Sequence, residues 1–327
     1  MSKTPYRLSV EQLASLFIQL ERLESAGLSA DHAFEIMAKS ERLLQKPLAM
    51  MLQNLKSGRS ISEAGLKAGL FNDTQKTLIH AAETSGRLAD AYGLLANYYA
   101  GLDSRRRKVR SRLYLPALML ILALFIQPLP ALIGSQLSGL GYLQLSLGRL
   151  VVIGFSTFLL VKLPEIIDGL GVEKVWHRLQ LRIPGLSQWI IKRQINDFLV
   201  ILAMMLESGL AFAVALPKAV ASIRNSSLRE QFAPALRIAS SGATVAEILA
   251  QVPAMKPTTL SIVKSGEYSG KLSSTLLHLS RQEAETISLQ DDALAEWIPR
   301  LVYMLVAIWI AYSLLRGQIA TGLPSGM

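Results

Sequence analysis

The residues with the clearest chemical potential form a short motif that occurs twice. The motif is Glu-x-Ser-Gly-x-Leu, and its second copy follows the first after 184 residues, from 83 to 267. Its polar and glycine positions are Glu83, Ser85 and Gly86 in the first copy and Glu267, Ser269 and Gly270 in the second. The glutamates allow two interpretations: a cap or ion pair within a helical bundle, or a contact with a partner protein. We favour the interpretation within the bundle.

Other residue types give no support for an enzyme. His80-x-x-Glu83 has a ligand spacing that a helix allows, but the second copy has Lys264 in place of His80, so we expect no metal pair. The chain has no cysteine, which excludes thiol nucleophiles, disulfides and Cys-based zinc sites. The motifs HExxH, GxSxG and the Walker loop are missing. We therefore expect no catalytic residue, no metal site and no cofactor.

Regular helix boundaries place the motif within two repeated blocks. Apolar residues with helical spacing stop at glycines that recur at matching offsets, Gly27 with Gly209 and Gly58 with Gly242. The segments Ser60-x-x-Glu63 and Thr244-x-x-Glu247 predict capping boxes at the start of the next helix in each block. Signals for β-strands are scarce. We predict an all-α fold with two repeated cytoplasmic bundles of about six helices each and three transmembrane helices.

Three apolar segments predict the transmembrane helices. Residues 113–133 carry no charge over 21 positions, which covers about 30 Å of bilayer as a helix. Residues 297–315 form the second predicted span, in which Arg300 precedes an uncharged run at 301–315. The segment 149–163 is weaker, because only 12 uncharged residues separate Arg149 from Lys162. This segment alone could also be a re-entrant or core helix.

The formal net charge of +10 is concentrated at the edges of these segments. Residues 1–104 hold 11 basic and 11 acidic side chains, and residues 164–296 hold 13 of each. Between the first block and the first span lie six cations, Arg105, Arg106, Arg107, Lys108, Arg110 and Arg112. We expect this run to fix a cytoplasmic orientation and to contact anionic lipid. It has no interleaved aromatic residues, so we expect no nucleic-acid partner.

These observations predict an organisation in eight segments. No long apolar stretch opens the chain, so we expect the N-terminus in the cytoplasm and insertion through internal segments. Three spans then place the C-terminus in the periplasm. The predicted segments are a cytoplasmic helical domain at 1–104, a basic juxtamembrane segment at 105–112, a transmembrane helix at 113–133, a short periplasmic loop at 134–148, a second transmembrane helix at 149–163, a second cytoplasmic helical domain at 164–296, a third transmembrane helix at 297–315 and a periplasmic tail at 316–327.

The sequence resembles the type II secretion F and type IV pilus inner-membrane platform proteins. The resemblance rests on residues 266–272 (Gly-Glu-Tyr-Ser-Gly-Lys-Leu), on the first copy at 82–88 with alanine in the leading position, and on Gly27-Leu28 and Gly209-Leu210. It covers residues 12–315, and members of the family are commonly longer at the N-terminus. The resemblance implies a non-enzymatic, self-associated platform in the bacterial inner membrane, with six-helix cytoplasmic domains and three membrane helices.

The same resemblance implies partners. It implies a hexameric cytoplasmic assembly ATPase, pilin or pseudopilin subunits that are inserted or extracted, and other inner-membrane pilus or secretion proteins. It applies equally to a pilus and to a secretion system. The alternative is a small oligomeric membrane transporter or channel, but Arg149 and Arg300 lie near predicted helix ends and not at the bilayer midplane. An intramembrane aspartyl peptidase would need acidic residues in its spans, and the three predicted spans contain none.

Overall fold

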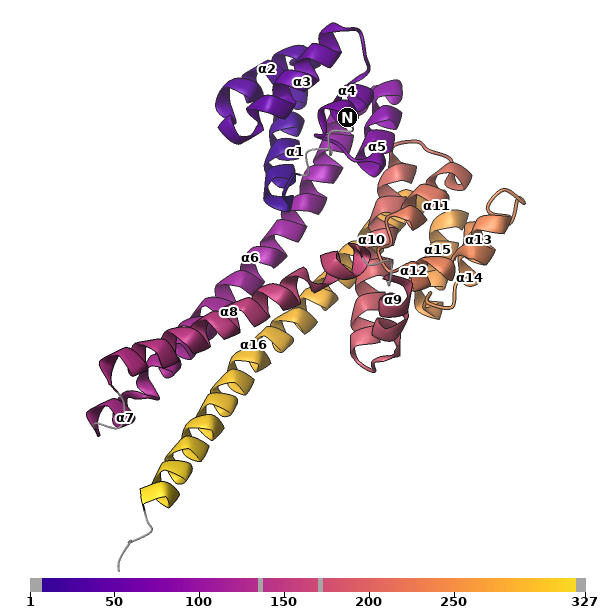
Figure 1. Ribbon diagram of the computed structural model, residues 1–327. Helices are drawn as coiled ribbons and strands as arrows, with labels where there is room; N and C mark the ends of the chain where they lie inside the picture. The colour runs from indigo at the N-terminus through magenta and orange to yellow at the C-terminus, as the bar shows by residue number, and fades with distance from the viewer. Residues whose placement is uncertain (1–7, 135–137, 170–172, 322–327) are drawn as a thin grey trace, which may run out of the picture. The chain divides into compact units, whose positions relative to one another are not determined.

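The computed structural model describes residues 8–134, 138–169 and 173–321 of the chain (Figure 1). Every element in these ranges is a helix, so the predicted all-α fold is confirmed. The chain divides into two compact units. The first consists of residues 1–105 and 174–287, which form two helical blocks, and the second of residues 106–173 and 288–327.

The first block consists of short amphipathic helices around an aromatic core. Its helices are α1 (Val10–Ser25), α2 (Ala30–Ser40), the 3-10 helix η1 (Arg42–Leu44), α3 (Gln45–Lys56), α4 (Ile61–Ala68), α5 (Asp73–Ser85) and the start of α6 (Leu88–Ile126). The buried ring of Phe17 stacks against Phe71 and Tyr99, with centroids 5.9 and 5.7 Å apart. Gly65 lies against the Phe71 ring so closely that a Cβ there would come within 1.9 Å of it. The core therefore fixes α4 against α1 and α6.

The second block repeats this plan. Its helices are α9 (Glu173–Arg182), α10 (Leu186–Glu207), α11 (Phe212–Ala221), α12 (Ser226–Glu230), α13 (Ala233–Ile238), α14 (Val245–Ala250), α15 (Pro257–Tyr268) and the start of α16 (Leu272–Thr321). Phe198 and Phe232 form its central ring contact, with centroids 4.7 Å apart. Four glycines that the sequence places at helix ends have positive φ: Gly27, Gly58, Gly209 and Gly242.

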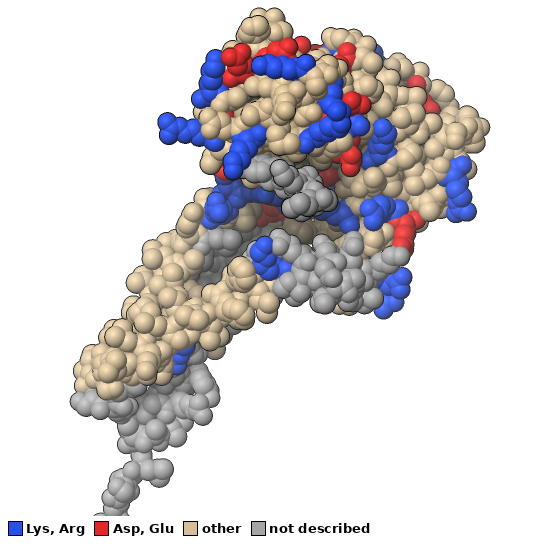
Figure 2. All heavy atoms as spheres, turned by 45° about the horizontal axis from the view of Figure 1, so that its top comes forward, with Lys and Arg blue, Asp and Glu red and all other residues tan. Residues whose placement is uncertain are grey.

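The second unit contains long, exposed apolar helices. It includes the end of α6, the short α7 (Leu129–Ile133), α8 (Gly139–Gly169) and the end of α16. In the part of the chain that the structure describes, α6 and the segment Gly139–Leu159 are long and apolar enough to cross a membrane. Almost none of the apolar stretch of either helix is buried against the rest of the chain. Much of this unit is tan in Figure 2, the colour of residues other than Lys, Arg, Asp and Glu. The predicted span at 297–315 falls within α16, but most of its side chains lie outside the described residues.

The helices of the second unit run through the basic segment 105–112 and through much of the predicted loop. Helix α8 begins at Gly139, so much of the predicted loop 134–148 is helical, and Arg149 lies inside the apolar helix. The Arg149 guanidinium donates to the side-chain oxygen of Gln127. One partnered cation does not end a helix, whose backbone hydrogen bonds are internal. The basic residues 105–112 likewise lie within the continuous α6, which ends at Ile126, before the predicted 133.

Long helices border the second block at both ends. Helix α8 continues to Gly169, and the compact unit that contains the second block resumes at Lys174. At its other end this unit ends at Ile287, and α16 continues into the second unit from Ser288. The predicted tail at 316–327 is helical as far as Thr321, and the residues after it lie outside the described ranges.

Candidate functional site

The first copy of the motif forms the corner between α5 and α6. The Ser85 hydroxyl donates to the carbonyl of Ala81 at 2.9 Å, one turn back in α5. Gly86 then adopts φ 69°, a left-handed conformation that costs other residues about 1–2 kcal/mol. The Arg87 amide donates to the carbonyl of Ala82 at 2.8 Å, the bond that closes a Schellman-type helix end. Helix α6 starts at once, at Leu88.

The second copy forms the equivalent corner between α15 and α16. The Ser269 hydroxyl donates to the carbonyl of Gly266 at 3.1 Å, and Gly270 has φ 65°. The Lys271 amide donates to the carbonyl of Gly266 at 2.9 Å. Helix α16 starts at Leu272. The motif thus gives the same tight reversal twice, each time directly before a long helix.

The glutamate of each motif caps a different helix from the one on which it lies. The Glu83 carboxylate accepts the amides of Ile61 at 2.8 Å and Ser62 at 3.4 Å, and the Ser62 hydroxyl at 3.1 Å. These are the first two residues of α4. Amides at a helix start have no partner within the helix, and the helix dipole favours a negative charge there. Glu83 therefore fastens α4 to the corner between α5 and α6.

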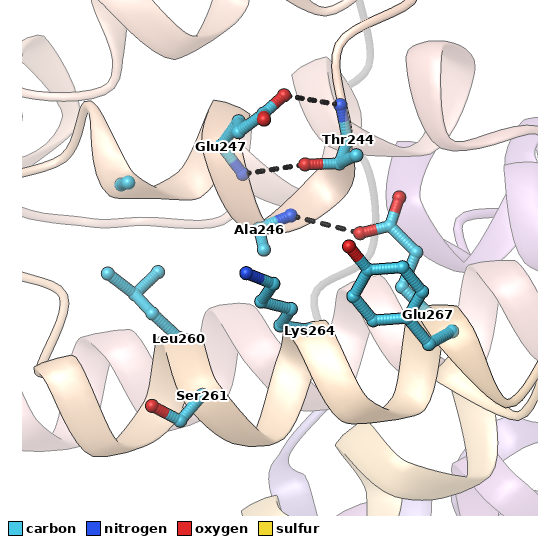
Figure 3. A pocket seen from close by; sticks show the side chains of 9 residues that line it. Thr244, Ala246, Glu247, Leu260, Ser261, Lys264 and Glu267 are labelled. Atoms are coloured by element: carbon cyan, nitrogen blue, oxygen red, sulfur yellow. Dashed lines mark hydrogen bonds between the residues drawn. The ribbon is translucent and has the colours of Figure 1, made fainter.

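Glu267 makes the same connection in the second block. Its carboxylate accepts the amides of Val245 at 2.7 Å and Ala246 at 3.2 Å, the first two residues of α14. Figure 3 shows the bond from Ala246. Next to it, the Thr244 hydroxyl accepts the amide of Glu247 at 3.2 Å, and Glu247 accepts the amide of Thr244 at 3.0 Å. The first three amides of α14 thus all have side-chain acceptors. We call these two arrangements, Glu83 on α4 and Glu267 on α14, the glutamate clamps.

The two blocks differ beside their clamps. In the second block a groove of about 320 Å³ opens between α14 and α15, and Lys264 lies along it (Figure 3). The exposed Tyr268 also lines this groove. The Lys264 ammonium lies 5.9 Å from the centre of the Tyr268 ring. In the first block His80 stands at the position of Lys264, and its Nδ1 lies 3.4 Å from the Ser62 hydroxyl. Within the described residues, no group of three or more His, Asp or Glu side chains could hold a metal ion.

One glutamate that the motif comparison missed connects both corners. Arg87 donates to the backbone carbonyl of Glu207 at 2.9 Å and lies 3.4 Å from its carboxylate. The Ser273 hydroxyl, in the first turn of α16, donates to the same carboxylate at 2.6 Å. Hydrogen bonds to Asp90 and then to Glu207 raise the pKa of the Arg87 guanidinium. Glu207 has no repeated counterpart, since Ser25 occupies its place before Gly27, so comparison of the copies could not reveal it.

The basic run has protein contacts that its sequence does not reveal. Lys108 forms an ion pair with Asp292 of α16. Arg112 donates to the backbone carbonyl of Asp292 at 2.9 Å and lies 3.4 Å from its carboxylate. Burial raises the pKa of Asp197 on α10, and the charge of the half-buried Arg105 opposes this shift in part. Asp292 thus contacts two of the six cations of the basic run.

These features define a duplicated, all-α protein in which each helical block ends in a clamped corner and continues as a long helix. The family model described as "Type II secretion system (T2SS), protein F" matches residues 17–134 and 198–315, one match for each copy. The chain belongs to this family, so the resemblance seen in the sequence is confirmed.

Relatives from both secretion and pilus systems are similar to the chain. It is 23% identical over 313 residues to "Type II secretion system protein F" of Pseudomonas aeruginosa, covering 86% of this chain and 75% of the relative. It is 25% identical over 288 residues to "Type IV pilus assembly protein PilC" of Thermus thermophilus, covering 82% and 71%. It is 23% identical over 320 residues to "Protein transport protein HofC homolog" of Escherichia coli, covering 89% and 78%.

Proposed function

We propose that this chain is the inner-membrane assembly platform of a type IV pilus or type II secretion machine. In this role it couples a cytoplasmic ATPase to the insertion or extraction of pilin-like subunits. Both helical blocks lie in the cytoplasm, and the chain acts as an oligomer with no catalytic chemistry of its own. The family membership and the names of the relatives support this proposal.

The observation that carries the coupling role is the direct passage from clamped corner to membrane helix. Helix α6 continues without a break from Leu88 to Ile126, about 60 Å, and includes an apolar span. Helix α16 starts from the second corner in the same way. Since the glutamate clamps fasten these corners to α4 and α14, a displacement of either block acts on a stiff helix and not on a flexible linker. Such stiffness is what a part that transmits motion requires.

The proposal is tested by deletion and complementation in the cell that carries the gene. We expect loss of the gene to abolish filaments or secretion while pilin-like subunits stay in the inner membrane. The full chain should restore assembly and co-purify with an assembly ATPase. A chain without residues 1–87 should still insert, because the spans are internal, but should not restore assembly. Normal filaments and secretion in the deletion strain would contradict the proposal.

A further inference from the structure

The basic segment, residues 105–112, lies within helix α6 and therefore has distinct faces. Residues four apart lie on one face of a helix, one turn from each other. Lys108 and Arg112 form one such pair, and both contact Asp292 of α16. Arg106 and Arg110 form a second pair, turned roughly 160° away from the first. We call Lys108 with Arg112 the inner face and Arg106 with Arg110 the outer face.

The outer face has no partner in the part of the chain that the structure describes. Arg106 and Arg110 are both exposed, and neither forms a hydrogen bond or ion pair with a described residue. The other four cations of the run already have polar or charged contacts. Arg105 lies near Asp197, Arg107 has a bonding or electrostatic contact, and the two residues of the inner face contact Asp292. Two guanidinium groups one turn apart are thus available to an external ligand.

The position of the outer face along α6 suits a membrane surface. The uncharged run of the span starts at Leu113, three residues after Arg110 and seven after Arg106. These spacings place the two Cα atoms about 5 and 10 Å before the apolar run, at the depth of the headgroup layer and its outer edge. Side chains on a helix lean toward its N-terminus, so both guanidinium groups lean away from the hydrocarbon. Guanidinium groups bind phosphate with two parallel hydrogen bonds.

We propose that the outer face, Arg106 and Arg110, binds the phosphates of anionic lipid headgroups, whereas the inner face, Lys108 and Arg112, fastens α6 to α16. The charges of the inner face are already balanced in part by Asp292, which lowers their attraction for a phosphate. The proposal deepens the lipid contact expected from the sequence and rests on the membrane orientation in the proposed function. It gives two separate tasks to residues that share one short basic run.

Two double variants with the same charge loss test the proposal. R106Q/R110Q neutralises the outer face and K108Q/R112Q the inner face, on one helix and with identical spacing. The purified full chain is reconstituted in phosphatidylcholine nanodiscs with graded phosphatidylglycerol, and the retained phosphatidylglycerol is counted by native mass spectrometry. Each cation near an anionic surface contributes about fivefold, so R106Q/R110Q should lose phosphatidylglycerol affinity by about 30-fold. K108Q/R112Q should keep the affinity within about threefold and show a lower unfolding midpoint in either lipid.

Three outcomes would overturn the inference. The first is wild-type phosphatidylglycerol binding by R106Q/R110Q, and the second is an equal loss in both double variants. The third is competition by free inorganic phosphate, which would indicate a soluble-anion site and not a lipid surface. Circular dichroism and size-exclusion chromatography establish that both variants are folded. The assay contains no ATPase and no pilin, so its failure and the failure of the platform role are separate results.

Discussion

Replacing Glu267 with alanine is expected to loosen the start of α14 and leave the rest of the chain intact. The carboxylate accepts two amides, at 2.7 and 3.2 Å, and lies at the positive end of the helix dipole. A hydrogen bond to a charged group contributes about 1.5–3 kcal/mol. Glu267 is only half-buried, so we take the lower end of that range and expect about 2–3 kcal/mol for the clamp as a whole.

Hydrogen exchange of the full chain in detergent measures this loss where it occurs. A local loss of 2–3 kcal/mol should speed amide exchange at the start of α14 by about 30- to 160-fold. Glu83→Ala should have the corresponding effect on α4 and leave α14 unchanged. Each variant is therefore the matched control for the other, since both glutamates accept the first two amides of a helix in separate blocks.

Conservative replacement separates charge from shape. Glu267→Gln keeps one carbonyl oxygen for the amide of Val245 but removes the charge, so its effect should lie between those of wild type and alanine. The clamp would be refuted by exchange at α14 that rises less than threefold in Glu267→Ala. A uniform rise throughout the second block would also refute it, since it would show general destabilisation in place of a lost local cap.

Four further outcomes follow from the same structure. Glu247→Ala should speed exchange at the α14 start by a few-fold, whereas the matched Glu63→Ala should not, since only Glu247 accepts the amide of its own N-cap. Gly270→Ala should lower the unfolding midpoint, with a cost of about 1–2 kcal/mol for its positive φ, whereas Gly101→Ala inside α6 should raise it slightly. Lys108→Asp should weaken the association of α6 with α16, and Asp292→Lys in the same chain should restore part of it, since this second change also removes the carboxylate beside Arg112; spin-label distances between the helices measure both effects. Burial raises the pKa of Asp197, so above that pKa the ionised carboxylate destabilises the folded state. Asp197→Asn should therefore raise the unfolding midpoint at neutral pH. The difference from wild type should disappear as the pH falls and the native carboxyl becomes protonated.

The motif was predictable from the sequence, but the acceptor role of its glutamates was only one of two interpretations. Repetition revealed Glu83 and Glu267 because both copies need the same corner. The groups that they bind are backbone amides of Ile61 and Val245, which carry no sequence signal of their own. The N-caps Ser60 and Thr244 were predictable because they are local patterns of side chains, but the predicted capping box forms only at Thr244, where Glu247 also accepts the amide of the cap.

Sequence patterns do not predict contacts between residues that lie far apart along the chain. Glu207 joins the two corners but exists in one copy only, so no comparison could mark it. The basic run suggested topology and lipid for all six cations, although Asp292 lies far along the chain and contacts two of them. The contact of Arg149 with Gln127 is a further example. Arg149 looked like a helix boundary because its contact with Gln127 could not be seen from either segment.

The ion pair between Lys108 and Asp292 joins equivalent positions of the two copies. Lys108 lies 20 residues after the start of α6 at Leu88, and Asp292 lies 20 residues after the start of α16 at Leu272. If both copies had kept the first sequence, lysine would stand opposite lysine, and like charges at this position would repel. The opposite charges therefore make the two halves of the duplication non-interchangeable. At this position α6 pairs favourably with α16, and a pairing of α6 with a second α6 would place two lysines together.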